Sequence, residues 1–209
     1  MNKAYVHLID DDQGVRDSLA MLLDSAGIRC RCFSGAEAFI AKADLSEPGC
    51  IVVDVRMPGI SGLDLLRILR ERGIDLPVIV MTGHAHVAMA VQALKDGAAD
   101  FIEKPFDDTT FLASVREALN RGERVLQDRR RRLEIEGRFA SLTPREREVM
   151  AFIVEGLSNK AAAVQLDISV RTVEIHRARV MEKMMAESLS ALVRMGLALE
   201  VSDSPVSGG

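Results

Sequence analysis

The sequence predicts a doubly wound α/β domain with a five-stranded parallel sheet, joined by a long linker helix to a small all-α domain. An apolar run that ends on a carboxylate, Cys50 to Asp54, is typical of a strand buried on both faces of such a sheet. Three other short apolar runs also end on polar side chains, and helical patterns separate them. Beyond about residue 120 only helical patterns follow, which indicates a second domain of another class.

Five predicted strands alternate with five predicted helices along residues 1–120. The strands are Val6–Ile9, Arg29–Phe33, Cys50–Asp54, Pro77–Thr82 and Asp100–Glu103. The helices are Gln13–Ser25, one starting at Ser34, Ser61–Glu71, His86–Asp96 and one from Asp107. Ser34 should cap its helix, because Glu37 follows three residues later as in a capping box. Since crossover connections are right-handed, this order predicts a parallel sheet with helices on both faces.

Polar side chains follow four of the strands at their carboxyl ends, where ligands bind in doubly wound sheets. We expect six side chains to converge there: Asp10, Asp11, Asp12, Asp54, Thr82 and Lys104. A single aspartate at a strand end is usually a helix cap or a solvated loop residue, but four matching strand ends are hard to obtain by chance. The histidines of His84-Ala85-His86 have no further ligand beside them and are interpreted as solvated loop residues.

The chemistry of this cluster suits phosphoryl transfer. Oxygen ligands without His or Cys beside them favour a hard cation such as Mg²⁺. A carboxylate such as Asp54 can attack phosphorus and form an aspartyl phosphate. Lys104 would neutralise phosphoryl oxygens, and Thr82 would supply a hydroxyl donor. Phosphoryl transfer needs mainly positioning and charge neutralisation, and this set of groups offers both.

Residues 1–120 resemble the receiver domain of two-component response regulators. The resemblance rests on Asp10-Asp11, on Asp54 with Met57-Pro58-Gly59 after it, on Thr82-Gly83 and on Lys104-Pro105-Phe106. It implies that Asp54 is the phosphoacceptor. It also implies that Asp11, Asp54 and the backbone carbonyl of Arg56 bind Mg²⁺, with Asp10 acting through water.

The same resemblance implies residues that switch the domain between two states. Thr82 would be the switch hydroxyl, Lys104 the phosphate-binding lysine and Phe101 the aromatic switch residue. The Lys104–Pro105 bond would be cis. The face that carries the helix from His86 and the strand to Glu103 would form the dimer contact in the phosphorylated protein.

Composition bounds the remaining possibilities. The chain has 209 residues, 48% of them apolar, and no apolar stretch reaches the ~18 residues that cross a bilayer. We expect a cytoplasmic protein with no signal peptide and no membrane partner. The three cysteines are interpreted as buried reduced thiols. Residues 1–119 hold 12 Lys and Arg against 18 Asp and Glu, which suits a cation site, whereas residues 120–209 hold 15 against 13 and permit an anionic partner.

Leucines spaced seven apart predict a helix that leaves the first domain and forms a linker over residues 121–137. They are Leu112, Leu119, Leu126 and Leu133. A strict heptad can signal a coiled coil. Gly122 and Arg129 occupy positions that need apolar residues, which favours a long connector helix, partly packed at its start, over a stable zipper. The run Arg129–Arg132 is interpreted as a solvated face, and it could also contact nucleic-acid phosphates or the acidic first domain.

The last part of the chain carries strong helix-start signals. Thr143 is followed by proline and then by Glu146, which predicts a capping box. A short helix over Asn159–Gln165, a turn and a helix capped by Ser169 predict a helix-turn-helix over Asn159–Ala178. The packed face of the second helix would hold Val173, His176, Val180 and Met184. The opposite face would hold Arg171, Glu174, Ile175, Ala178 and Arg179.

Residues 138–201 resemble the LuxR/FixJ-type DNA-binding domain. The resemblance rests on Leu142–Val149, on Gly156–Lys160, and on Ile168-Ser169 with Thr172–His176. The expected DNA-contacting residues are Asn159, Lys160, Arg171, Thr172, Glu174, Ile175, Ala178 and Arg179. A last helix over Ser188–Leu199 matches the family's dimerisation helix but could equally be core. Residues 202–209 are expected to be a disordered tail.

Two departures from this resemblance affect base reading. Many relatives carry lysine where this chain has Glu174, and a Glu-Ile pair where it has Ala161-Ala162. Glutamate accepts from cytosine N4, whereas lysine donates to guanine. The base contact at this position is therefore open.

The two halves together are similar to FixJ-like regulators, including the runs Thr82-Gly83-His84 and Phe101–Phe106. This implies a phosphorylation-controlled transcription factor whose partners are a sensor histidine kinase, promoter DNA, a second copy of the chain and RNA polymerase. Phosphorylation could release a masked DNA surface or drive dimerisation. Two other functions stay open. A phosphotransferase or phosphatase of the haloacid dehalogenase class would want an acid where Arg56 stands, and a constitutive DNA-binding protein would not need the acidic pocket.

Overall fold

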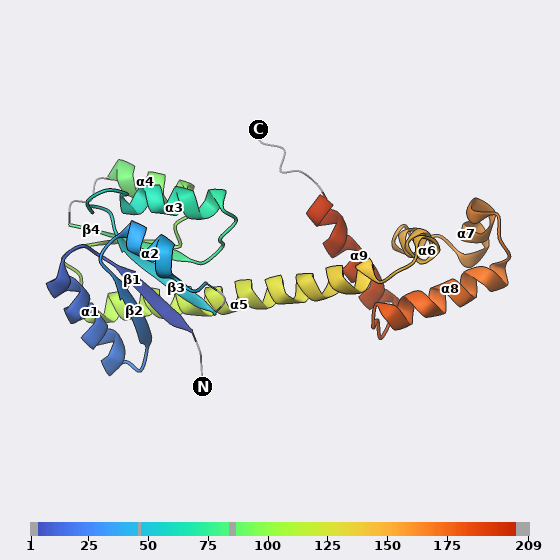
Figure 1. Cartoon of the computed structure of the whole chain (residues 1–209), viewed down its shortest axis with the longest axis horizontal. Coiled ribbons are helices and arrows are strands. Elements are labelled where there is room, and N and C mark those ends of the chain that lie inside the picture. Colours follow the sequence, from blue (N-terminus) through green and yellow to red (C-terminus); the bar gives the residue numbers. More distant parts are fainter. Residues whose placement is uncertain (1–3, 46, 84–86, 204–209) are drawn as a thin grey trace. The chain divides into compact units, whose positions relative to one another are not determined.

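The chain folds into two units, and each has an apolar core of its own (Figure 1). The computed structural model describes residues 4–45, 47–83 and 87–203. The first unit runs to Gln127 and the second starts at Asp128. The boundary falls inside one helix, α5 (Asp108–Ala140), and later than the boundary expected at residue 120. None of the described helices is both long and apolar enough to cross a membrane.

The five strands of the first unit form one parallel sheet, as predicted. They are β1 (Tyr5–Ile9), β2 (Arg29–Phe33), β3 (Gly49–Asp54), β4 (Val78–Thr82) and β5 (Asp100–Glu103). Their order is β2-β1-β3-β4-β5, and every neighbouring pair is parallel. The winding direction changes between β1 and β3, which lie side by side. Ligands of doubly wound sheets bind at this switch point, so the ends of β1 and β3 are the place to seek a site.

Helices cover both faces of the sheet and enclose two separate cores (Figure 1). They are α1 (Gln13–Ser25), α2 (Ala36–Lys42), α3 (Gly62–Glu71), α4 (Val87–Lys95) and the first part of α5. The core under α2, α3 and α4 contains Phe39 and Leu66, and the core under α1 and α5 contains Leu23 and Phe111. These four side chains are at most 1% exposed. Burial of apolar side chains on both faces is the main force that holds the sheet between its helices.

Helix α2 begins differently from the prediction. Its N-cap is Gly35 and no side chain caps it, so the capping box expected from Ser34 and Glu37 is wrong. Glu37 Oε1 instead accepts a hydrogen bond from the backbone N–H of Ile60 at 3.0 Å. Gly59, whose φ is +78°, lies against the same carboxylate, and a Cβ atom there would collide with it. Glu37 therefore fastens the loop after β3 instead of capping its own helix.

Gly122 allows α5 to lie directly against the sheet. An added Cβ atom at Gly122 would collide with the carbonyl oxygen of Gly49, the first residue of β3. The glycine that interrupts the leucine heptad is thus required by packing within the first unit. Along the same helix Leu119 is buried, whereas Leu133 is 58% exposed. The predicted packing of the connector helix at its start is confirmed, and its far end is packed as well, through Ile135 in the second unit.

The cysteines form no disulfide, but only one of them is buried. Cys50 in β3 is fully enclosed, and burial raises the pKa of its thiol to about 12. Cys30 and Cys32 both lie on β2, where Cys30 is half-buried and Cys32 is exposed. The predicted burial is wrong for Cys32, because β2 is an edge strand with a neighbour on one side only.

The second unit packs short helices around one core. Its helices are the end of α5, α6 (Pro144–Val154), α7 (Asn159–Leu166), α8 (Val170–Lys183) and α9 (Leu189–Asp203). Ile135 of α5 is buried with Val149 and Val180, so the end of α5 belongs to this core. Helix α9 extends to Asp203, past the end expected at Leu199 and into the first residues of the expected tail. The rest of that tail, 204–209, lies outside the described residues.

Helix α9 divides its apolar residues between the core and the surface. Leu192 is fully buried, and Val193 and Met195 pack against the same core. Leu189 and Leu197 are 45% and 49% exposed. The core interpretation therefore holds for Leu192, Val193 and Met195, whereas Leu189 and Leu197 are exposed to a partner.

Helix α6 starts with the predicted capping box. The Thr143 hydroxyl accepts from the Glu146 N–H, and Glu146 Oε2 accepts from the Thr143 N–H at 2.8 Å. Lys183 Nζ of α8 donates to the same carboxylate oxygen at 2.6 Å. The bonds from Lys183 and Thr143 lower the pKa of the buried Glu146 to about 2. Glu146 therefore joins the start of α6 to the end of α8.

Replacing Glu146 with glutamine should remove a pH-dependent part of the stability of the second unit. The pKa of Glu146 falls from 4.5 to about 2 on folding, so the ionised carboxylate stabilises the folded state fully above pH 4.5. This contribution is lost as the pH falls towards 2. The free energy of unfolding of Glu146→Gln should be lower than that of the wild type near pH 6, and the two should converge near pH 2.

Denaturant unfolding followed by circular dichroism across this pH range measures the difference. Glu148→Gln is the matched control, because Glu148 lies on the same helix and its side chain is 47% exposed. It should show a much smaller pH dependence. A destabilisation by Glu146→Gln that stays constant from pH 6 to pH 2 would contradict the role of the ionised carboxylate.

Candidate functional site

Three charged side chains meet at the carboxyl ends of β1, β3 and β5. Lys104 Nζ donates to Asp54 Oδ1 at 2.7 Å and to Asp10 Oδ2 at 2.9 Å. Asp10 is 2% exposed, and the side chain of Asp54 is 10% exposed. Two carboxylates this close repel each other, and the ammonium group between them offsets that repulsion. The structure thus brings three of the six expected side chains into direct contact.

The backbone holds the second oxygen of each carboxylate. Asp54 Oδ2 accepts from the N–H of Arg56 at 2.6 Å, and Asp10 Oδ1 accepts from the N–H of Asp12 at 2.9 Å. Burial by itself would lower the pKa of Lys104. The hydrogen bonds to Asp54 and Asp10, together with their charges, outweigh burial and raise the pKa of Lys104 above its usual value. The lysine is therefore charged at neutral pH.

The other expected residues lie around this contact in different ways. Asp11 is exposed. Asp12 is the N-cap of α1, where its Oδ1 accepts from the N–H of Gly14 at 2.7 Å. The expectation that Asp12 joins the cluster is wrong, because the helix starts immediately after it and its free N–H groups need an acceptor. Thr82 is buried at the end of β4, and Phe101 of β5 is half-buried against the core under α3 and α4.

Two supporting residues are not visible in the sequence pattern. Arg16 of α1 donates to the backbone carbonyl of Asp10 at 2.6 Å. Glu37 of α2 holds the loop that follows Asp54, as described above. Both contacts depend on how a helix packs against a strand, so residue type and spacing could not have indicated them. The Lys104–Pro105 bond is cis, as the resemblance implies.

The donor set at this site fits a hard cation in its chemistry. Asp10, Asp54 and the neighbouring backbone carbonyls offer oxygen only, and two carboxylates against one ammonium leave negative charge. Among the described residues, no group of three or more His, Cys, Asp or Glu side chains is placed to hold a metal. Asp11 is the exposed carboxylate that would have to turn inward. Lys104 occupies one oxygen of each buried carboxylate.

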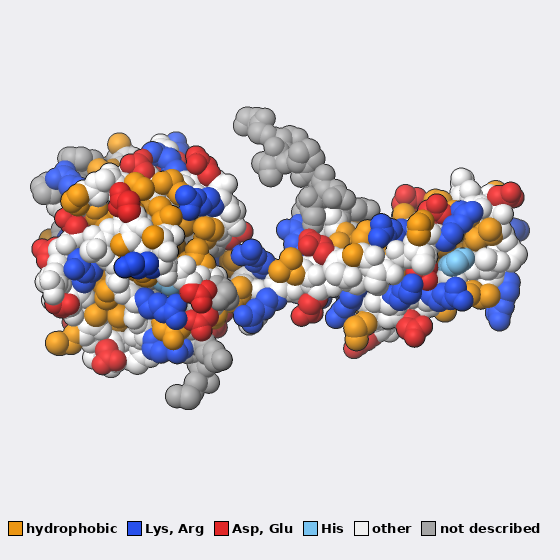
Figure 2. All heavy atoms as spheres, in the orientation of Figure 1, with side chains coloured by type: hydrophobic (Ala, Val, Ile, Leu, Met, Phe, Trp, Pro, Cys, Tyr) orange, Lys and Arg blue, Asp and Glu red, His pale blue; other side chains and the backbone are white. Residues whose placement is uncertain are grey.

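The helix-turn-helix of the second unit presents one packed and one open face. Ser169 Oγ accepts from the N–H of Thr172 at 3.0 Å and lies 2.8 Å from its hydroxyl, so both residues build the start of α8. The buried residues of α8 are Val173 and Val180, and Met184, the C-cap of the helix, is buried as well. The exposed residues are Arg171, Glu174, Ile175, Ala178 and Arg179. Figure 2 shows Lys and Arg side chains along this part of the unit.

Two contacts hold side chains at the open face. Asn159 Oδ1 at the start of α7 accepts from Arg177 of α8 at 3.0 Å, which joins the two helices. Arg171 donates to Glu174 at 3.3 Å, with exposed fractions of 81% and 46%. Such an exposed pair is weak and can open when a ligand binds. Lys160 is exposed. Arg177 is the residue of this surface that the sequence analysis missed.

The two histidines that the structure describes, His7 and His176, do not add a second site. Nδ1 of His176 is enclosed and has no hydrogen-bond partner among the described residues, which agrees with the packed position expected for it. His84 and His86 lie outside the described residues. His7 of β1 is buried between Phe33 and Phe39, and burial lowers its pKa to about 4.

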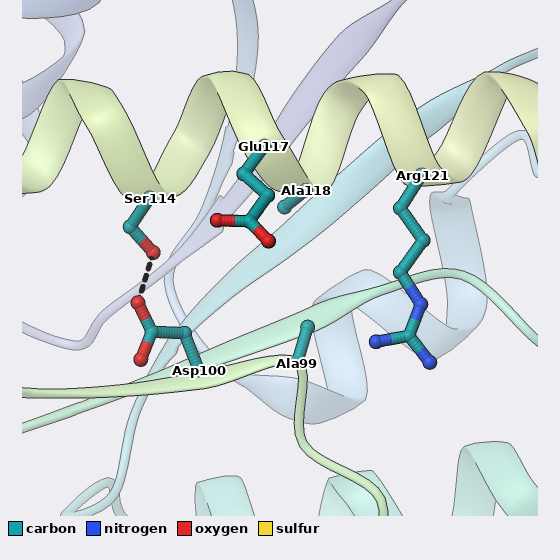
Figure 3. A pocket seen from close by; sticks show the side chains of 6 residues that line it. All are labelled: Ala99, Asp100, Ser114, Glu117, Ala118 and Arg121. Carbon is teal, nitrogen blue, oxygen red and sulfur yellow. Dashed lines mark hydrogen bonds between the residues drawn. The ribbon is translucent and has the colours of Figure 1, made fainter.

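A cavity of about 170 Å³ lies elsewhere in the first unit, between α5 and the start of β5 (Figure 3). It is lined by Ala99, Asp100, Ser114, Glu117, Ala118 and Arg121. Ser114 Oγ donates to Asp100 Oδ2 at 2.6 Å across it. The cavity is at the amino end of β5, whereas Lys104 follows its carboxyl end. It is therefore separate from the carboxylate site.

A buried aspartate bridged to a lysine on a doubly wound sheet, followed by a helix-turn-helix, defines a DNA-binding response regulator. The profile of the response regulator receiver domain matches residues 6–116, and that of the bacterial regulatory proteins of the luxR family matches residues 140–196. The chain belongs to the response regulators that combine a receiver domain with a LuxR-type DNA-binding domain.

Curated relatives and solved structures agree with this family. The transcriptional regulatory protein FixJ of Azorhizobium caulinodans is 53% identical over 92% of this chain and 91% of its own length. FixJ of Bradyrhizobium diazoefficiens is 46% identical over 93% and 95%. The solved response regulator StyR has a TM-score of 0.81 at 36% identity, covering 93% of this chain and 98% of its own. This chain is a FixJ-like, phosphorylation-dependent transcription regulator, and its two domains imply a sensor kinase partner and DNA binding.

Proposed function

We propose that Asp54 is the residue that accepts the phosphoryl group, with Lys104 as its charge partner. The observation that supports this is the bridge from Lys104 to Asp54 and Asp10 at the switch point of the sheet. Asp54 Oδ1 is the oxygen that would attack phosphorus, because Oδ2 is held by the Arg56 N–H. Lys104 would move its bonds from the carboxylates to the phosphoryl oxygens, which carry more charge.

We further propose that Mg²⁺ assists this reaction through Asp11, Asp54 and the backbone carbonyl of Arg56, with Asp10 acting through water. When bound, the ion would neutralise charge on the phosphoryl group and orient it towards the carboxylate. Lys104 would give up its hold on Asp54 and Asp10 as the phosphoryl group arrives. Thr82, buried at the end of the neighbouring strand, would donate a hydrogen bond from its hydroxyl to a phosphoryl oxygen. The side chain of Phe101 would then turn towards the interior of the domain.

The proposed consequence of phosphorylation is a homodimer on promoter DNA. Three apolar side chains of α4 are unusually exposed for the first unit, and apolar patches of this kind mark interaction sites. They are Val87 at 83%, Val91 at 45% and Leu94 at 52%. A dimer would let two α8 helices read two half-sites at once. RNA polymerase is the further partner expected for a transcription regulator in the cytoplasm.

Selection of bound sequences from a random DNA pool tests the function as a whole. The acetyl-phosphate-treated protein should enrich one motif with two related half-sites, and untreated protein should enrich it weakly. Ultracentrifugation of the two samples should show a dimer only after treatment. Equal enrichment by both samples would mean that DNA binding is independent of phosphorylation and would refute this part of the proposal.

Replacing Glu174 with alanine should relax the preference for one base pair in each half-site. Glu174 lies on the open face of α8, and a carboxylate there can accept from cytosine N4 once its bond to Arg171 opens. The expected loss is ~1–3 kcal/mol of discrimination at that position, with little change elsewhere in the motif. Binding measured on operators with each base substituted in turn gives this number.

Lys160→Ala is the comparison that separates base reading from phosphate contact. Lys160 is an exposed cation near the start of α7, so its loss should weaken binding to all DNA sequences alike. The slope of log binding constant against log salt concentration should become shallower by roughly one unit. Glu174→Ala should leave the salt slope unchanged or steeper. An unchanged motif in the Glu174 variant would show that Glu174 does not read a base.

A further inference from the structure

Two cysteines lie on β2, an edge strand of the sheet. Cys30 and Cys32 are two residues apart on β2, so both side chains project from the same face. They pair in register with Val6 and Leu8 of β1, whose side chains belong to the core under α1 and α5. Cys30 packs at the margin of that core, while Cys32 is exposed. Because β2 is an edge strand, solutes can reach the pair from outside.

The two thiols interact with each other. Burial, together with the neighbouring thiol of Cys32 and its hydrogen bond, raises the pKa of Cys30 to about 11. A thiol with a high pKa exchanges slowly with disulfides, because the thiolate is the attacking form. A soft metal ion can displace the proton and bind the resulting thiolate, and this binding does not require thiol–disulfide exchange. Cys30 is therefore poorly suited to redox exchange, and metal binding does not depend on that exchange rate.

Strand geometry also disfavours a disulfide here. With about 3.3 Å of rise per residue, the Cα atoms of residues two apart are about 6.6 Å from each other. That is close to the upper end, about 6.8 Å, of the range in which disulfides form. Two metal–sulfur bonds of about 2.3 Å reach between sulfur atoms up to about 4.6 Å apart. Two thiols that project from the same face of one strand can reach this span by rotation of their side chains, without movement of the strand.

We propose that Cys30 and Cys32 bind one copper(I) ion between their two sulfur atoms. Among the described residues no group of three or more His, Cys, Asp or Glu side chains converges, so the pair has no third ligand of these types nearby. Zinc requires four ligands in a structural site, whereas soft thiolates select copper(I), which accepts two. Each thiol releases its proton to the solvent, and copper keeps its oxidation state.

The remaining cysteine provides an internal control. Cys50 pairs in register with Val6, which pairs with Cys30, so two strand spacings separate the two cysteines. At about 4.8 Å for each spacing the separation is about 9.6 Å, which two metal–sulfur bonds cannot bridge. Cys50 is also fully buried. It should make no contribution to copper binding.

Titration of the reduced full-length protein with copper(I) in competition with a chromophoric chelator tests the proposal. The wild type and Cys50→Ala should bind one ion per chain, with two sulfur neighbours by X-ray absorption. Cys30→Ser and Cys32→Ser should each bind at least about 100-fold more weakly. Because the thiolates are the forms that bind the ion, affinity should rise with pH.

Circular dichroism of each variant shows whether it is folded, and exposed Cys32 is the safer of the two positions to replace. Wild-type affinity in folded Cys32→Ser, or nitrogen and oxygen neighbours instead of sulfur, would overturn the proposal. So would loss of binding in folded Cys50→Ala. Zinc(II) that binds the wild type more tightly than copper(I) would overturn the choice of metal.

Discussion

Replacing Asp54 with asparagine should abolish labelling of the protein by a small phosphodonor such as acetyl phosphate. The amide nitrogen and oxygen of asparagine do not act as nucleophiles towards phosphorus at neutral pH. The substitution keeps the size of the side chain, so Asp10 and Lys104 should stay paired and the fold should persist. Phosphate-affinity electrophoresis or intact mass measurement should detect one added phosphoryl group in the wild type and none in Asp54→Asn.

Asp75→Asn is the matched control for this substitution. Asp75 is a carboxylate of the same unit whose side chain is 70% exposed, and it contacts only the guanidinium of Arg70 at 3.6 Å. Its labelling should equal that of the wild type. One phosphoryl group per chain on the Asp54→Asn protein would show that another residue is the acceptor.

Replacing Phe111 with alanine should destabilise the first unit by about 3–5 kcal/mol. Phe111 is fully buried under the sheet, and its ring stacks on Phe106 with centroids 5.3 Å apart. Removal of the ring leaves a cavity between α5 and the sheet that the surrounding strands cannot fill. The second unit has a separate core, so its own unfolding should change little.

Denaturant unfolding combined with hydrogen-exchange mass spectrometry assigns the loss to one unit or the other. Leu133→Ala lies on the same helix at a side chain that is 58% exposed, and it should cost less than about 1 kcal/mol. Faster exchange in β1 to β5 but not in α6 to α8 is the expected pattern for Phe111→Ala. Equal acceleration in both units would contradict the separation of the cores.

The sheet and the helix-turn-helix were predictable because their signals are local. Apolar runs such as Cys50 to Asp54 encode burial on both faces, and the proline and Glu146 after Thr143 encode a helix start. The start of α2 was not predictable from Ser34 and Glu37. A carboxylate can serve a helix cap or a distant loop equally well, and only the packed structure brings Ile60 within its reach. Local pattern therefore identifies elements better than it identifies the partners of polar side chains.

The same limit applies to the phosphoryl site. Asp10 and Asp54 follow the adjacent strands β1 and β3, and Lys104 follows β5, which β4 separates from β3. All three lie at the carboxyl ends of parallel strands, so their meeting was predictable from strand ends alone. Asp12 has the same residue type and nearly the same position, but the start of α1 takes its side chain as a cap. Arg16 supports the site from a helix face that no spacing rule links to Asp10. The exposure of Cys32 was missed because the sequence of β2 alone does not show that this strand lies at the edge of the sheet.

The parallel sheet acts as a partition inside the receiver. Phe101 packs with Val80 in the core under α3 and α4, whereas Phe111 and Val115 of α5 pack in the core on the other side. A movement of Phe101 would therefore change the packing beneath α4 directly. It could affect α5 only through the backbone of the strands. A conformational change that starts at Asp54 should therefore alter mainly the face of the domain that α3 and α4 cover. The helices on the opposite face, including the first part of α5, can keep a constant position against the sheet in both states.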